Sequence, residues 1–265
     1  MAHQTPLATW LYSKRSELNP QFKEFNWPSQ VLPDVFDFET KISWGYVEAD
    51  GRGVDHRREI ALEKSVAEAI ERLICKTLGF DSIGLAVAGT HDPSLHAKFE
   101  CLERFYLNEH LNNSIPLTRI TFSCPEVLKF QTVLPSADVS FYRMRTPENI
   151  FGIVCSIHAE KLNQSSLGFA LSENLEQSIR RAFLEALPNF AWMISGEQIQ
   201  IVDLPWHLQP SFIEKVKALF CDETISALKE SSIPEVISVG LSLDTLPVLA
   251  DAPLKIARYQ IVGLK

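Results

Sequence analysis

The sequence predicts an α+β fold. Helical and strand-like segments alternate irregularly along the 265 residues. In the middle of the chain, several strand-like segments succeed one another, separated only by residues typical of turns. No linker rich in Gly, Ser or Pro divides the chain. We therefore expect a single domain over residues 1–265. It comprises an irregular N-terminal extension at 1–40, a core at 41–195, and C-terminal helices and strands at 196–265.

The expected elements follow from hydrophobic periodicity and turn residues. A helical pattern covers 56–78, and a second helix, reaching about His110, begins at Asp92 and Pro93, which suit an N-cap and a first-turn position. Pro188 should kink or end a third helix at 175–194. A turn is expected at 50–53. Amphipathic helix is expected at 211–230, and strands are expected at 41–47, 83–88, 117–123, 139–145, 151–159, 167–171, 198–203, 236–243 and 256–264.

Composition excludes several classes of protein. Asp and Glu outnumber Lys and Arg by 33 to 25, a net charge of −8. Without a basic run, we expect no nucleic-acid partner. No stretch approaches the roughly 18 to 20 apolar residues of a membrane-spanning helix, and the first residues do not resemble a secretory signal. The five cysteines form no Cys-x-x-Cys pair, which is typical of reduced thiols in a cytoplasmic protein.

Two expected helices carry the same arrangement of carboxylates. Glu68-x-x-Glu71-Arg72 is repeated 32 residues later as Glu100-x-x-Glu103-Arg104. The strand and helix around the second copy are echoed again, because the segment from Gly84 to Glu100 resembles the segment from Gly168 to Glu185. The sequence therefore predicts quasi-repeated strand–helix units that present acidic helix faces to one cleft.

Glutamates at positions i and i+3 lie on one face of a helix and can share a partner. Their oxygens suit Mg²⁺, which proteins hold with one or two carboxylates plus phosphate oxygens and water. A solvated helix face with local ion pairs is the alternative interpretation. The apolar neighbours of both pairs favour the first, because a buried carboxylate is costly unless it is paired or bound to a metal.

The ordered set of motifs resembles the YcaO family over about residues 41–192. Each motif is weak alone, but their order and approximate spacing agree. The set comprises Gly51-Arg52-Gly53, Ala61, Glu68-Ala-Ile-Glu71-Arg72, Gly84-Leu-Ala-Val-Ala-Gly89, Glu100-Cys-Leu-Glu103-Arg104 and Arg181-Ala-Phe-Leu-Glu185.

This resemblance implies a YcaO-like fold, with mixed and antiparallel sheets around an acidic nucleotide cleft, and binding of ATP and Mg²⁺. It implies phosphorylation of a backbone amide in a ribosomal precursor peptide, leading to an azoline, a thioamide or a related product. By position, the resemblance places the metal on the four paired glutamates and the nucleotide on those glutamates and four further residues. These are Glu68, Glu71, Glu100 and Glu103 for the metal, and additionally Arg52, Arg104, Arg181 and Glu185 for the nucleotide.

Departures from the family pattern keep a second function open. Arg52 stands where the family commonly has lysine, Lys64 stands where it has a small hydroxyl residue, and Pro188 stands where many members have glutamine. The proline-rich tail of azoline-forming members does not follow Lys265. The alternative is therefore a catalytically reduced subunit that binds or scaffolds in a peptide-modifying complex.

The expected partners follow from the same resemblance. The substrate is a precursor peptide, and no leader-binding module is evident, so we expect a leader-peptide-binding or activating partner protein. Self-association into a homo-oligomer is compatible with the sequence, and no membrane partner is expected. No catalytic side chain of the protein itself is assigned, because phosphoryl transfer depends chiefly on positioning and electrostatic stabilisation.

Overall fold

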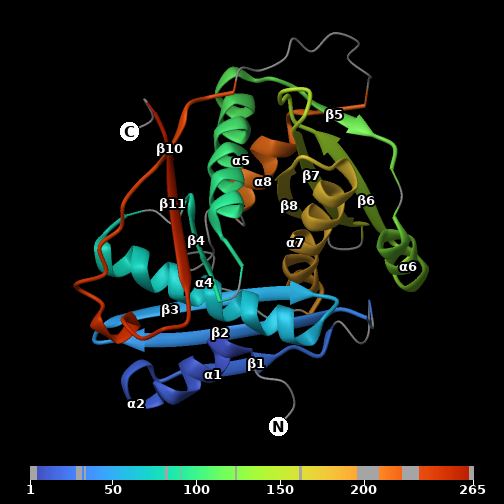
Figure 1. Cartoon of the computed structure of the whole chain (residues 1–265). Helices are drawn as coiled ribbons and strands as arrows, with labels where there is room; N and C mark the ends of the chain where they lie inside the picture. Colours follow the sequence, from blue (N-terminus) through green and yellow to red (C-terminus); the bar gives the residue numbers. More distant parts are fainter. Residues whose placement is uncertain are drawn as a thin grey trace. The chain divides into compact units, whose positions relative to one another are not determined.

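The computed structural model describes residues 5–27, 32, 34–80, 83–89, 91–122, 124–160, 163–195, 209–222 and 233–262. The chain folds into two compact units (Figure 1). The first unit comprises Met1–Cys101 and Glu235–Lys265, and the second comprises Leu102–Pro234. Helix α5 (Ser94–Asn113) contributes residues to both units. The predicted single domain, with divisions at residues 40 and 195, stays a prediction.

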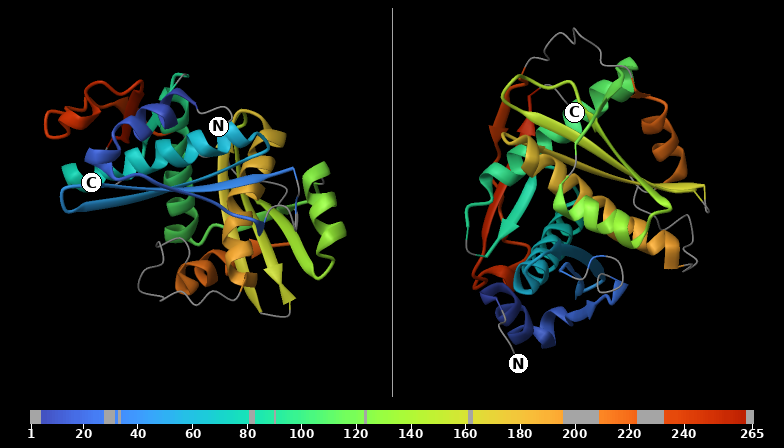
Figure 2. Two further views of the ribbon diagram at one scale, coloured as in Figure 1. Left: turned by 90° about the horizontal axis from the view of Figure 1, so that it is seen from below. Right: turned by 90° about the vertical axis from the view of Figure 1, so that its right-hand side faces the viewer.

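The first unit contains two antiparallel sheets of three strands each. One has the order β1 (Gln21–Glu24), β2 (Phe36–Trp44), β3 (Val47–Asp55). The other has the order β10 (Val236–Ser238), β11 (Lys255–Ile261), β4 (Leu85–Ala88). Helix α4 (Arg58–Leu78) lies along the β2–β3 hairpin, as Figure 2 shows from below. The remaining elements are α1 (Pro6–Ser13), α2 (Arg15–Leu18) and the short 3₁₀ helix η4 (Pro247–Leu249).

The core of the first unit forms around the apolar face of α4. Val66, Ile70 and Leu73 of this helix are fully buried and pack with residues of α1, β4 and η4, among them Leu7 and Leu249. The expectation of an irregular segment at 1–40 is therefore wrong. Pro at the first helical turn and the side-chain cap of Thr5 start α1, and burial of its apolar face against α4 stabilises this short helix.

The turn expected at 50–53 is also wrong, because these residues lie within strand β3. The hairpin turns earlier, where Gly45 has a φ of 59°. Gly51 and Gly53 serve a different purpose: a Cβ at Gly51 would overlap the carbonyl oxygen of Ser65, and one at Gly53 would overlap that of Ala61. Both glycines allow close packing of α4 on the strand.

The second unit is a five-stranded sheet with helices on both faces. Its strand order is β8 (Gln164–Ser172), β7 (Phe151–Ala159), β6 (Ala137–Arg143), β5 (Leu117–Ile120), β9 (Phe220–Cys221), antiparallel except for β5 and β9. Phe130 of α6 (Pro125–Val133) stacks edge-on against Phe183 of α7 (Leu175–Ser195). On the opposite face, Phe169 contacts Phe212 of α8 (Pro210–Lys217).

Most of the predicted long elements are present, with three differences in the second unit. Helix α7 continues through Pro188 instead of ending there. Helix α6 was not predicted, because its nine residues are too few to give a clear period. The helical stretch expected at 211–230 ends at Lys217 in the described part, and strand β9 follows it. The strand expected at 198–203 lies outside the described residues.

Helix α5 starts close to the expected position. Asp92 accepts hydrogen bonds from the backbone N–H and the hydroxyl of Ser94, while the Pro93 carbonyl accepts the first helical bond from Ala97. Pro93 rather than Asp92 therefore occupies the N-cap position. In the described part of the chain, no helix combines the length and the hydropathy that crossing a membrane requires.

Candidate functional site

Among the predicted glutamates, Glu103 is buried and the others are half-buried. Four of these glutamates each accept a hydrogen bond from a backbone amide that lies in an edge strand of a sheet or directly next to one. Arg52 of β3 donates to Glu68 at 2.7 Å and Val87 of β4 donates to Glu71 at 2.7 Å. The Gly84 amide donates to Glu100 at 3.3 Å, and the Phe169 amide of β8 donates to Glu185 at 3.1 Å. These four side chains therefore have backbone partners beyond their own helix, while Glu68 also forms a local ion pair with Arg72 of the kind that the alternative interpretation expects.

The same strand–helix construction occurs in both units. In β3–α4, Gly51 lies against α4 and the next amide, that of Arg52, binds Glu68. In β8–α7, Gly168 lies against α7 and the Phe169 amide binds Glu185. Because the glycine has no side chain, the helix can pack close to the strand. The backbone amide of the next residue on the strand then donates a hydrogen bond to a carboxylate of that helix. This structural repeat relates β3–α4 to β8–α7, whereas the echo in the sequence related the segment from Gly84 to Glu100 to that from Gly168 to Glu185.

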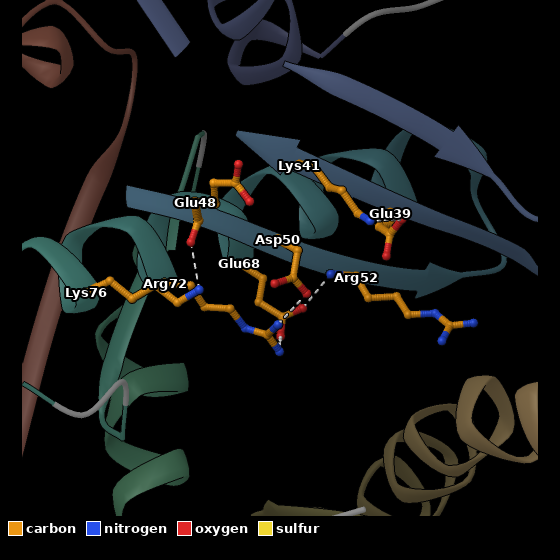
Figure 3. Close-up of polar contacts among 8 residues, drawn as sticks. All are labelled: Glu39, Lys41, Glu48, Asp50, Arg52, Glu68, Arg72 and Lys76. Carbon is orange, nitrogen blue, oxygen red and sulfur yellow. Dashed lines mark hydrogen bonds and ion pairs between the residues drawn. The ribbon is translucent and has the colours of Figure 1, made fainter. Parts of the chain in front are cut away.

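Helix α4 covers the open edge of β3 with side chains spaced four residues apart. Lys64 donates to the Val54 carbonyl, Glu68 accepts from the Arg52 amide, and Lys76 donates to the Glu48 carbonyl at 2.6 Å. Four helical residues rise about 6 Å and two strand residues about 6.6 Å, so the two periods match. Figure 3 shows the part of this row from Glu68 to Lys76. The row leaves little of this edge available for pairing with another strand.

The first unit gathers Glu68, Glu71 and Glu100. Burial raises the pKa of Glu71 well above its ordinary value, and the neighbouring carboxylates of Glu100 and Glu68 raise it further. Burial also raises the pKa of Glu68, although Arg72 and the Arg52 amide oppose this. Arg72 lies between Glu68 and Asp50, at 2.5 and 2.8 Å (Figure 3). A cation beside these carboxylates would relieve the repulsion and the burial cost of their charge.

The second unit gathers Glu103, Arg104, Arg181 and Glu185. Burial raises the pKa of Glu185 to about 8, and the Glu103 carboxylate adds to this, while the Arg104 and Arg181 guanidinium groups oppose it. The Arg104 guanidinium lies 3.6 Å from a Glu103 oxygen and 5.9 Å from the centre of the Phe169 ring. This unit therefore combines two carboxylates with two cationic groups suited to phosphate oxygens.

The Arg52 side chain is engaged within the protein, and its assignment to the nucleotide stays a prediction. Its guanidinium forms a two-pronged ion pair with Asp37, with nitrogen–oxygen distances of 2.6 and 3.0 Å, and lies over the Phe25 ring. Figure 3 shows the side chain leading away from Glu68. Its backbone amide donates to the predicted Glu68. Asp37, which holds it, was not predicted; a lone acid between Phe36 and Phe38 in a half-buried strand is the signal that could have indicated it.

The donor set fits a hard cation only with help from a ligand. In the described ranges, no three His, Cys, Asp or Glu side chains come together in a way that could hold a metal. The carboxylates present are nevertheless the oxygen donors that Mg²⁺ prefers, and Mg²⁺ is commonly held by one or two of them with phosphate oxygens and water. The residues therefore fit magnesium carried by a phosphate ligand better than a magnesium ion held by protein alone.

Comparisons with known proteins agree with this geometry at the level of fold. The structure of YcaO from Methanopyrus kandleri bound with AMPPCP and Mg²⁺ aligns with 98% of this chain and 91% of its own, with a TM-score of 0.67 and 14% identity. The chain has the YcaO fold. A heterocyclase in complex with substrate and cofactor aligns with 100% of the chain at a TM-score of 0.66 and 11% identity. This chain spans 53% of that heterocyclase.

The likeness is structural. No protein-family model matches the sequence, and no curated protein matches it. The α+β class and the YcaO resemblance predicted from the motifs are confirmed by the fold.

Proposed function

We propose that this YcaO-like chain binds Mg²⁺–ATP through its half-buried and buried glutamates and activates a backbone amide of a precursor peptide. The observation that carries the proposal is the proximity of like charges withdrawn from solvent, Glu71 near Glu100 and Glu185 near Glu103, on helices fixed to strand amides. A structural helix face has no need for such pairs. Relatives by fold that hold AMPPCP with Mg²⁺, or substrate with cofactor, support the same interpretation.

The chain's own residues have separable tasks in this proposal. Glu68, Glu71 and Glu100 would hold magnesium in the first unit, and Glu103 would hold magnesium in the second. Arg104 and Arg181 would bind phosphate oxygens, and Glu185 would contact the nucleotide. Bound Mg²⁺–ATP supplies the phosphoryl group that makes an amide oxygen a leaving group. The strand amides hold the carboxylates before the ligand arrives, which reduces the reorganisation needed on binding.

Calorimetric titration with ATP and Mg²⁺ tests the nucleotide site. We expect the wild type to bind and Glu71→Gln to lose binding, because the amide keeps the Val87 hydrogen bond but removes the charge. Glu24→Gln is the matched control, since Glu24 forms an exposed ion pair with Arg58 in the same unit. Equal signals from the wild type and Glu71→Gln would contradict the proposal.

A catalytically reduced subunit is the second candidate, and one observation favours it. Two positions that depart from the family pattern are engaged within the protein: Arg52 pairs with Asp37, and Lys64 pairs with Asp55 at 2.7 Å. A wild-type chain that binds no nucleotide but copurifies with a peptide-modifying partner would establish this candidate. The same copurification tests three proposed interactions of the chain: with the precursor peptide, with a partner protein and with a second copy of itself.

A further inference from the structure

A buried acidic residue outside the predicted set lies at the start of a chain of contacts to Glu68. Asp37 on β2 has a side-chain exposure of 0%. Its carboxylate accepts hydrogen bonds from the indole N–H of Trp27 at 2.5 Å and from the Arg52 guanidinium at 2.6 Å. Its carbonyl accepts from the Phe25 amide. A buried carboxylate with this many hydrogen-bond donors around it is held in one place.

Arg52 connects this carboxylate to the acidic residues through its two ends. Its side chain is bound to Asp37, and its backbone amide donates to Glu68. Both neighbours of Arg52 are glycines whose lack of a side chain lets α4 approach. Pairing with β2 anchors the two glycines, Gly51 opposite Thr40 and Gly53 opposite Phe38. The Arg52 side chain, bound to Asp37, adds a further anchor between them, where glycine restricts the backbone least.

We propose that Asp37 is a positioning residue, which fixes the Arg52 amide and thereby the orientation of Glu68. This inference rests on the proposed function, in which Glu68 is one of the carboxylates that bind Mg²⁺–ATP. Asp37 acts on Glu68 indirectly and is not proposed to contact the ligand. Its effect passes through one side chain and one backbone amide, all within the first unit.

The variant Asp37→Asn separates this inference from direct phosphate binding by Arg52. If the Arg52 guanidinium binds phosphate, release from Asp37 leaves nucleotide affinity unchanged or improves it. If Asp37 positions Glu68, the same variant weakens nucleotide binding, by about tenfold for a loss of about 1.4 kcal/mol. Arg52→Lys adds a second distinction, because lysine keeps the charge but cannot form the two-pronged pair.

Hydrogen exchange of the Arg52 amide, followed by NMR without nucleotide, tests the inference independently of binding. We expect faster exchange of this amide in Asp37→Asn and in Arg52→Lys, and no change in Glu24→Gln, which alters only the exposed Arg58 pair. Trp27→Phe is the milder variant if Asp37→Asn unfolds, because it removes a single donor and keeps an aromatic ring. It should give a smaller change in the same direction.

Calorimetry with Mg²⁺ and ATP on the same proteins completes the test. We expect weaker binding in Asp37→Asn and Arg52→Lys, and no further loss when the two are combined, since both break one contact. Unchanged exchange at Arg52, or unchanged or tighter binding in Asp37→Asn, would overturn the inference. If the wild type binds no nucleotide, the proposed function fails, while amide exchange still decides whether Asp37 holds Arg52.

Discussion

Glu185 shows what burial does to a single carboxylate in this protein. The amide of Phe169 and two arginines favour its charged form, yet desolvation and Glu103 outweigh them and raise its pKa to about 8. Burial and neighbouring carboxylates also raise the pKa of Glu71, a proposed magnesium ligand, well above its ordinary value, and a carboxyl group held protonated releases its proton when a cation binds beside it. Nucleotide binding with magnesium should therefore release protons near pH 7.5, which calorimetry in buffers of different ionisation enthalpy measures.

The same pKa fixes the sign of a stability change. Because the folded pKa lies above the ordinary value of 4.5, the contribution of Glu185 is fully present below pH 4.5 and is lost as the pH rises toward about 8. Glu185→Gln keeps an acceptor for the Phe169 amide but does not titrate. Within this range, we expect the free energy of unfolding of the variant to rise relative to that of the wild type by about 1.4 kcal/mol per pH unit. Urea unfolding at a series of pH values measures this difference. A gap that stays constant with pH would contradict the assignment.

His110 gives the opposite dependence. Its Nε2 accepts a hydrogen bond from the Arg145 amide and its Nδ1 lies 2.8 Å from the Ile115 carbonyl, so the neutral ring fits both partners. Burial lowers its pKa below 6.5. The contribution of His110 to the free energy of unfolding is therefore fully present above pH 6.5 and is lost as the pH falls through its lowered pKa. His110→Gln should have a lower free energy of unfolding than the wild type at pH 7.5, but should lose less of it on acidification to pH 5.5. His91→Gln, at an exposed position, is the control and should behave like the wild type.

At the scale of elements, close strand–helix packing decides where the acids lie. A Cβ at Gly51 would overlap backbone atoms of α4, while a Cβ at Gly240 would meet no atom within 4 Å. Gly51→Ala should therefore lower the free energy of unfolding by about 1–3 kcal/mol, the range for an overpacked core. Gly240→Ala, as the control, should change it by less than about 0.5 kcal/mol. Thermal and urea unfolding measure both, and equal effects would show that α4 can move away from the strand.

At the scale of the molecule, ligand binding and stability are linked. If the chain binds Mg²⁺–ATP only when folded, a concentration of 100 times Kd stabilises it by about 2.7 kcal/mol. We expect the melting temperature to rise with Mg²⁺ and ATP together, and the rise to disappear in Glu71→Gln and persist in Glu24→Gln. A rise of equal size in all three proteins would point to binding elsewhere.

The sequence by itself determined the α+β class and the long helices α4, α5 and α7, while the carboxylates that it assigns to a nucleotide site stay a prediction. Helical period, glycine spacing and repeated Glu-x-x-Glu pairs are local signals, and they survive in the fold because packing agrees with them. Tertiary structure alone decided that residues 50–53 form a strand, that the N-terminal segment is helical, and that Arg52 turns to Asp37. These outcomes depend on contacts between residues distant in sequence, where burial against α4 or a buried ion pair outweighs local preference.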